Sequence, residues 1–183
     1  MPGRNPQEAF DAFIAPLKDA VSVLDGHAQF VAPRKGGFRL GQEYSWLLNS
    51  PQGMPLRGVG TLHAQMWFKF VKADTSKHEG AIRVTTLGYL YRLEGLDSKD
   101  IWRAHWHPQG NSPVSVPHVH IAPHLKSHFI TPRITFENVV QWCAELGAPL
   151  RCTLEEAVTR LELAQAQHVL FRSWNTRPDE PRG

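Results

Sequence analysis

The sequence lacks the features that mark several large classes of protein. It has two cysteines in 183 residues, Cys143 and Cys152, which are too few for a disulfide scaffold and too far apart for a CxxC metal knuckle. No segment approaches the roughly 18 apolar residues of a membrane helix, and the first ten residues lack the apolar stretch of a signal peptide. We therefore expect a cytoplasmic protein whose two cysteines are core thiols.

Several common catalytic motifs are missing as well. Gly58-Val59-Gly60 lacks the third glycine of a dinucleotide-binding loop, and the chain has neither a Walker loop nor a GxSxG elbow. A more local absence is that of acidic residues, because no Asp or Glu occurs between Asp100 and Glu137. A carboxylate ligand or base for a site in this stretch would have to come from elsewhere in the fold.

What is present is the composition of an ordinary globular protein. Hydrophobic residues make up 42% of the chain and charged residues 20%, with a net charge of +3. A chain of this length is long enough to bury a core of its own. We expect one α+β domain over residues 1–174, followed by a disordered tail over 175–183.

Hydrophobic periodicity predicts the elements of this domain. Asn5, Pro6 and Glu8 are typical of a helix start, and a capping box from Thr153 to Glu156 predicts a last helix that reaches about Trp174. Helical spacing also marks residues 136–146, while alternation predicts strands at about 38–48, 62–70, 82–93, 102–106 and 118–121. A slip of the apolar phase between Val84 and Leu87 indicates a β-bulge. The pattern favours a twisted, mainly antiparallel sheet of about five strands, with the N-terminal helix and two C-terminal helices covering one face.

Histidines are concentrated in one short segment. Six of the ten fall within 24 residues: His105, His107, His118, His120, His124 and His128. In the two strands of this segment, the first four of them alternate with apolar residues, so each pair shares one strand face. A hairpin is the simplest way to join these strands. If Trp106 and Val119 oppose each other on the buried face, the register pairs His107 with His118 and His105 with His120.

The same segment carries positive charge without acidic neighbours. Arg103, Lys126 and Arg133 lie in the acid-free stretch, together with hydroxyl donors such as Ser127. Such a strip should attract phosphate, so we expect Arg103, Arg133, Ser127, His124 and His128 to contact the substrate.

This inventory fits RNA cleavage by internal transesterification. One histidine would take the proton of the 2′-hydroxyl, another would protonate the leaving oxygen, and a cation would stabilise the phosphorane. We expect the metal-independent catalytic set to be His105, His107, His118, His120 and Lys126. Two alternatives stay open: the four histidines hold zinc or another transition metal, or they form a structural cluster.

The segment HWHPQGNSPVSVPHVHI, followed by ITFENVVQWCAELG, resembles the histidine-rich core of uncharacterised bacterial families near the TumE-type toxins of toxin–antitoxin systems. The resemblance covers residues 101–147 and depends on His105, His107, His118 and His120. It implies a toxin that acts on RNA and has a cognate antitoxin as partner. A non-enzymatic alternative is a partner-binding protein of a defence or toxin–antitoxin module, which would dock through its terminal helices.

Overall fold

The computed structural model describes residues 2–32, 36–77, 79–108 and 114–171. The elements follow one another in this order: α1 (Pro6–Val21), β1 (Phe30–Val31), β2 (Glu43–Leu48), β3 (Met54–Leu56), β4 (Gly60–Lys72), β5 (Ile82–Gly95), β6 (Asp100–Trp106), β7 (His118–Ile121), β8 (Phe129–Ile130), α2 (Phe136–Glu145) and α3 (Leu154–Leu170). The tail expected over residues 175–183 and the helix end expected near Trp174 lie outside the described residues.

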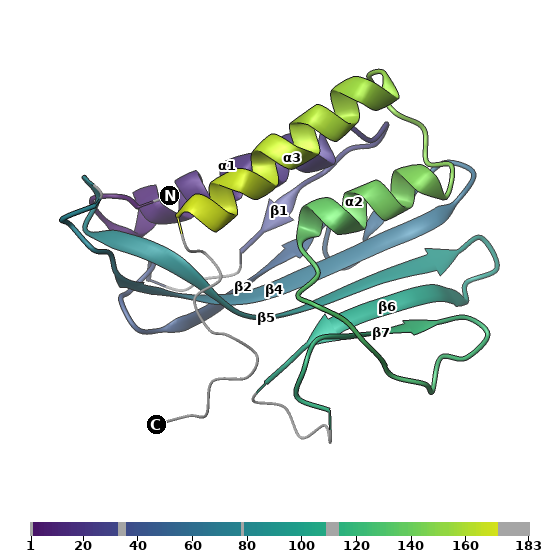
Figure 1. The fold of residues 1–183 in the computed structure, drawn as a ribbon, viewed down its shortest axis with the longest axis horizontal. Helices are drawn as coiled ribbons and strands as arrows, with labels where there is room; N and C mark the ends of the chain where they lie inside the picture. Colours follow the sequence, from purple (N-terminus) through teal and green to yellow (C-terminus); the bar gives the residue numbers. More distant parts are fainter. Residues whose placement is uncertain (1, 33–35, 78, 109–113, 172–183) are drawn as a thin grey trace.

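The strands form one antiparallel sheet in the order β1-β2-β4-β5-β6-β7-β8, with β3 paired to the start of β4 (Figure 1). The predicted α+β class is therefore confirmed, whereas the sheet has eight strands rather than about five. The additional strands β1, β3 and β8 contain only two or three residues each. Alternation cannot be recognised over so short a length, so a sequence pattern cannot reveal them.

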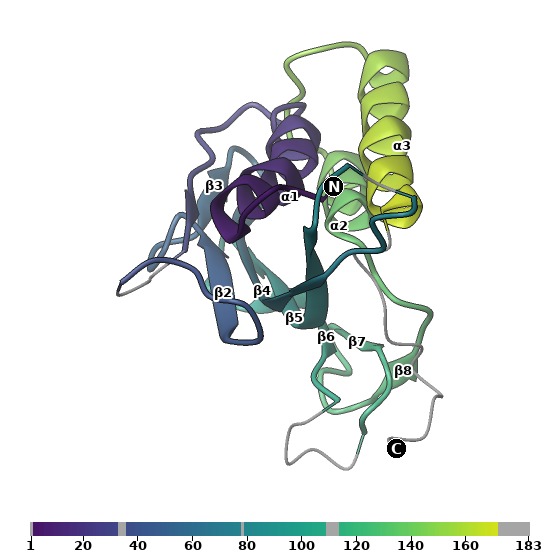
Figure 2. The same ribbon diagram turned by 90° about the vertical axis from the view of Figure 1, so that its left-hand side faces the viewer.

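All three helices lie on one side of the sheet, as predicted (Figures 1 and 2). The Asn5 side chain accepts a hydrogen bond from the Glu8 backbone N–H and caps α1, and the predicted capping box of Thr153 and Glu156 opens α3. A second capping box, of Thr135 and Asn138, opens α2. These caps fix where each helix begins and so how it lies against the sheet.

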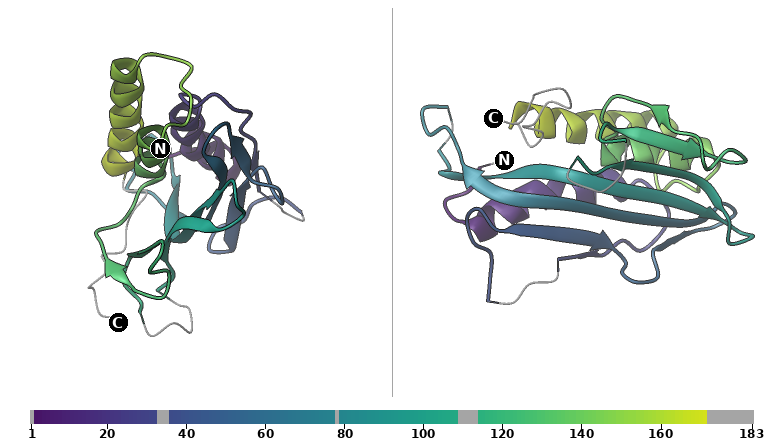
Figure 3. Two further views of the ribbon diagram at one scale, coloured as in Figure 1. Left: turned by 90° about the vertical axis from the view of Figure 1, so that its right-hand side faces the viewer. Right: turned by 90° about the horizontal axis from the view of Figure 1, so that it is seen from below.

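The core fills the space between the sheet and the helices. Its largest fully buried side chains include Trp46, Phe68, Tyr91, Trp106 and Phe136. The Phe136 ring of α2 packs edge-on against Trp46, with ring centroids 5.5 Å apart, and also contacts Tyr91. The other sheet face, which carries the histidines of β6 and β7, has no helix over it in the described part of the chain (Figure 3).

The predicted bulge in the third long strand is present. The register between β4 and β5 shifts between Trp67 and Phe68, because Trp67 pairs with Gly88 whereas Phe68 pairs with Thr86. Leu87 is the extra residue, at the place where the apolar phase slips in the sequence.

The register of the β6–β7 hairpin differs from the predicted one by two residues. Val119 pairs with Ala104 rather than Trp106, and the predicted pairing of His107 with His118 and of His105 with His120 is wrong. Instead His118 pairs with His105 and His120 pairs with Arg103. A shift of two residues keeps every side chain on its face, so the apolar pattern cannot distinguish the two registers.

One further property of the elements concerns membranes. Among the described residues, no helix is both long and apolar enough to cross a bilayer.

Candidate metal centre

Three histidines converge on the open face of the β6–β7 hairpin. His105 lies on β6 and faces its strand partner His118 on β7, with ring centroids 4.3 Å apart. The His120 ring lies 4.7 Å from that of His105 and 5.2 Å from that of His118. One ligand atom of each residue lies within 4.8 Å of the other two. We call these three residues the histidine trio.

Two more imidazoles lie against the trio. The His107 ring, just beyond the end of β6, is 5.1 Å from His105, and the His128 ring is 4.6 Å from His120. His128 reaches this position because the chain turns back after β7, where the backbone N–H of His124 donates to Ile121 and that of Ser127 donates to His124. His124 itself is exposed in this turn.

Two members of the trio are buried and His105 is half-buried, although no helix of the described chain covers them. His118 is 0% exposed and His120 is 7% exposed, since the imidazoles and the returning turn cover one another. Three of their ring nitrogens have no hydrogen-bond partner among the described residues: His105 Nε2, His118 Nε2 and His120 Nδ1. Buried polar atoms without a partner are unusual in native proteins and call for a physical reason, such as a bound ion.

One backbone contact fixes the orientation of His118. Its Nδ1 lies 2.8 Å from the carbonyl oxygen of Val116, so that nitrogen donates its proton there and Nε2 keeps its lone pair. This is the arrangement found in metal-binding histidines, where the second ring nitrogen donates to a carbonyl or carboxylate.

Burial and mutual repulsion keep the trio uncharged. Burial, together with the neighbouring histidines, lowers the pKa of His105 to about 3. Burial is also the largest cause that lowers the pKa of His118 and of His120. At neutral pH these imidazoles are neutral, which is the form that binds a metal ion.

The three basic residues expected to act on the substrate, Arg103, Arg133 and Lys126, do not lie together in the structure. Arg103 lies on the trio's face and opposite His120, but its guanidinium binds the carboxylate of Asp100, which also pairs with Arg92 at 3.4 Å. Arg133 lies on the helix side of the sheet, where its guanidinium stacks 4.0 Å above the Trp106 ring. Lys126 and Ser127 are exposed in the turn after β7 and are not part of the trio.

Asp100 is the residue near the site that sequence reasoning missed. Its side chain is only 5% exposed and orients Arg103 beside His120. The sequence contains a signal for it, since Asp100 lies three residues before Arg103, at the start of the alternating stretch.

Comparison of the chain with protein-family models, with curated proteins and with solved structures finds no significant match. The geometry of the site is therefore the basis for assigning its chemistry.

The geometry suits a transition metal better than a hard cation. The trio offers only imidazole nitrogens, which suit zinc, copper, iron or nickel, whereas magnesium and calcium prefer oxygen ligands. Zinc–nitrogen bonds of 2.0–2.1 Å place tetrahedral ligand nitrogens about 3.3 Å apart. The ligand atoms of the trio lie within 4.8 Å of one another, so each separation exceeds the value needed around zinc by about 1.5 Å at most. Small rotations of the side chains would close this difference.

Proposed function

We propose that this protein is a transition-metal enzyme whose metal is held by His105, His118 and His120. The observation that carries the proposal is the convergence of three neutral imidazoles, those of His118 and His120 buried and that of His105 half-buried, each with a ring nitrogen that lacks a partner among the described residues. Zinc fits such a site best, because three histidines with one open position are typical of catalytic zinc. A metal held in this way would activate water for hydrolysis.

The surrounding residues give the proposed site its remaining functions. His107 and His128 lie against the trio and are the candidates to carry protons to and from the reacting groups. Arg103, held by Asp100, lies beside His120 and is the candidate to contact an anionic substrate. The exposed Lys126, in the turn that leads to His128, is a second candidate to contact such a substrate. RNA is therefore the first substrate to test, as a phosphodiester with accessible backbone oxygens.

The second candidate is RNA cleavage without a metal, the activity that the toxin resemblance implies. It is favoured by the presence of five neighbouring imidazoles, which provide enough groups for a separate base and acid. It would require one histidine to stay protonated beside the others, and the repulsion within the cluster opposes this. As a toxin, the protein would have an antitoxin partner. Both candidates suit a reducing, cytoplasmic setting, in which Cys143 and Cys152 stay free.

An activity assay on a metal-defined protein separates the two candidates. Untagged protein is stripped with a chelator, reloaded with zinc, and incubated with a single-stranded RNA oligonucleotide and with bis(p-nitrophenyl) phosphate. We expect cleavage only after reloading, and a loss of at least about 100-fold in rate in His118→Ala, because removal of a ligand should cost at least as much as the roughly 10- to 100-fold typical of changes in the groups that support a ligand. His27→Ala, which alters an exposed histidine outside the cluster, is the matched control. Full RNA cleavage by the stripped protein would reject the metal enzyme and support the metal-free one.

A further inference from the structure

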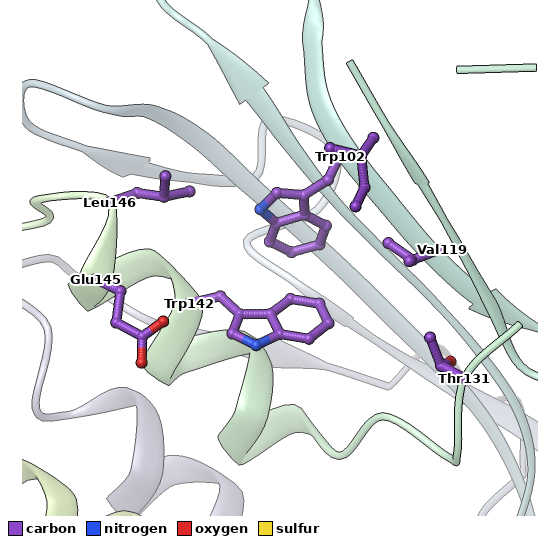
Figure 4. A pocket seen from close by; sticks show the side chains of 7 residues that line it. Trp102, Val119, Thr131, Trp142, Glu145 and Leu146 are labelled. Carbon is purple, nitrogen blue, oxygen red and sulfur yellow. The ribbon is translucent and has the colours of Figure 1, made fainter. Parts of the chain in front are cut away.

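A cavity of about 330 Å³ lies on the helix side of the β6–β7 hairpin, behind the histidine trio (Figure 4). Its walls include the indoles of Trp102 on β6 and Trp142 on α2, and the side chains of Val119 and Ile121 on β7. Val119 lies between His118 and His120 in the strand but points to the other face, so the cavity and the trio are separated by the thickness of the sheet. It plays no part in the proposed chemistry.

We propose that this cavity binds a small, neutral aromatic molecule of one or two rings that carries a hydrogen-bond acceptor. The volume is at the lower end of that of small-molecule sites and matches a ligand of one or two rings. Ile121 and Leu146, which are 46% and 48% exposed, mark the side on which a ligand can enter. A mostly apolar lining with few polar groups is what such ligands require.

The two indoles account for the aromatic part of the ligand. Trp102 and Trp142 meet at 84° with ring centroids 5.4 Å apart. A third ring inside the cavity can stack on one indole and meet the other edge-on, the two arrangements that aromatic rings prefer. Because the indoles pack on each other, they do not form the open cage that would enclose a quaternary ammonium ion between ring faces.

The polar atoms of the lining are the reason why the ligand should carry a hydrogen-bond acceptor and no charge. The Nε1–H group of Trp102, a residue only 5% exposed, has no hydrogen-bond partner among the described residues. In Figure 4 this nitrogen lies on the side of the ring that faces Leu146. The Thr131 hydroxyl is likewise buried without a partner among the described residues. A ligand acceptor that reaches the Trp102 Nε1–H removes a desolvation cost. The exposed carboxylate of Glu145 at the rim disfavours an anionic ligand.

Three probes of nearly the same shape test the proposal on the full chain. Acetophenone carries a carbonyl acceptor, ethylbenzene lacks it, and benzoate is an anion. Binding is followed through the indole ¹⁵N–¹H signals, with that of Trp102 identified from its loss in Trp102→Phe. We expect acetophenone to shift the Trp102 signal and to bind about 3- to 10-fold more tightly than ethylbenzene, the range for one net hydrogen bond. Benzoate should bind more weakly than acetophenone. In Trp102→Phe the preference for acetophenone should disappear.

A blocking variant makes the test specific to the cavity. Ile121→Trp fills the mouth and should abolish binding, whereas Leu163→Trp, the same kind of change on the exposed side of α3, should leave it unchanged. Equal binding to Ile121→Trp and to the unaltered chain would overturn the proposal. So would an unshifted Trp102 signal, or self-association of the chain that Ile121→Trp removes, since the cavity would then be an interface between two copies. The outcome does not depend on metal, because stripped and zinc-loaded protein should bind the probes alike.

Discussion

His105 and His118 are direct cross-strand partners whose ring centroids lie 4.3 Å apart, and neither ring has a carboxylate within the cluster to neutralise a positive charge. Protonation of either ring is unfavourable, because burial and the neighbouring imidazoles disfavour the positive charge. Both rings therefore stay neutral, and a dication that binds their lone pairs would be favourable. This relationship is the reason to regard the cluster as a metal site rather than as a structural feature of the sheet.

Zinc should stabilise the protein only while the trio is complete. At zinc concentrations about 100-fold above the dissociation constant, the folded state gains about 2.7 kcal/mol, which raises the melting temperature. His118→Ala should abolish this gain, so that zinc no longer raises its melting temperature, although loss of the buried ring lowers the melting temperature of the metal-free variant as well. Differential scanning calorimetry with and without zinc checks both statements. An equal zinc-dependent rise in His118→Ala would argue against the trio.

The buried pair of Glu137 and His168 should make stability depend on pH independently of the metal. Its Oε1 and Nε2 atoms lie 3.4 Å apart between α2 and α3, and burial raises the pKa of Glu137 to about 7 and lowers that of His168 to about 4. A raised carboxyl pKa means that the folded state binds a proton more tightly than the unfolded state, whose ordinary value is 4.5. The contribution of Glu137 is therefore present at low pH and is lost as pH rises from about 4.5 through 7. The lowered pKa of His168 acts in the opposite direction between about 4 and 6.5, so the effect of Glu137 must be measured against a variant that keeps His168.

Glu137→Gln tests this dependence. Between pH 5 and pH 8 the unaltered protein should lose about 2 kcal/mol of unfolding free energy relative to this variant, because a neutral amide has no proton to release. Urea unfolding at both pH values gives the difference, and Glu145→Gln, in the same helix but exposed, is the control. If the two proteins lose stability in parallel, the carboxyl of Glu137 is not the group responsible.

Gly88 should be required for the position of β6. A Cβ atom at this position would lie 2.6 Å from the carbonyl oxygen of Trp106, the residue next to His105. Gly88→Ala must therefore displace the end of β6, at a cost of about 1–3 kcal/mol, and should also weaken zinc binding. Gly95→Ala, at the end of the same strand, meets only side chains of Asp97 and Ile101 at 3.2–3.5 Å and should have a smaller effect on both. Chemical denaturation and zinc titration of the two variants check this, and unchanged zinc affinity in Gly88→Ala would show that the trio tolerates the displacement.

Asp100 should act on the substrate through Arg103. Asp100→Asn removes the charge that holds the guanidinium beside His120, so it should raise KM for an anionic substrate while metal content stays at the level of the unaltered protein. Asp97→Asn, which alters an exposed acid near the same turn, is the matched control. Steady-state kinetics and metal analysis on the same samples separate the two effects. Loss of metal in Asp100→Asn would instead place Asp100 among the groups that support the trio.

The faces of the sheet could be predicted from the sequence, because alternation fixes which side chains share a face. For this reason His105, His118 and His120 were expected together, opposite Trp106 and Val119, and that placement is confirmed. The register could not be predicted, since a shift of two residues preserves the pattern. The true register places His107 beyond the end of β6, which leaves a trio where four paired histidines were expected.

Contacts that depend on turns and on distant segments cannot be predicted from the alternation of apolar and polar residues. The approach of His128 to the trio requires the turn over residues 122–127, and no periodicity describes a turn of this kind. The separation of Arg133 from Arg103 has a similar cause. Arg133 follows β8, and its side depends on how the chain leaves that short strand to enter α2.

The most direct test of the metal centre is the metal content of the untagged protein, measured by inductively coupled plasma mass spectrometry after equilibration with zinc and removal of excess ion. The unaltered protein and His27→Ala should each retain about one zinc per chain, and His105→Ala, His118→Ala and His120→Ala should each retain far less, as expected for loss of one of three ligands. Retention of the same amount of zinc by all five proteins, or of none by the unaltered protein, would contradict the assignment of the histidine trio as a metal site.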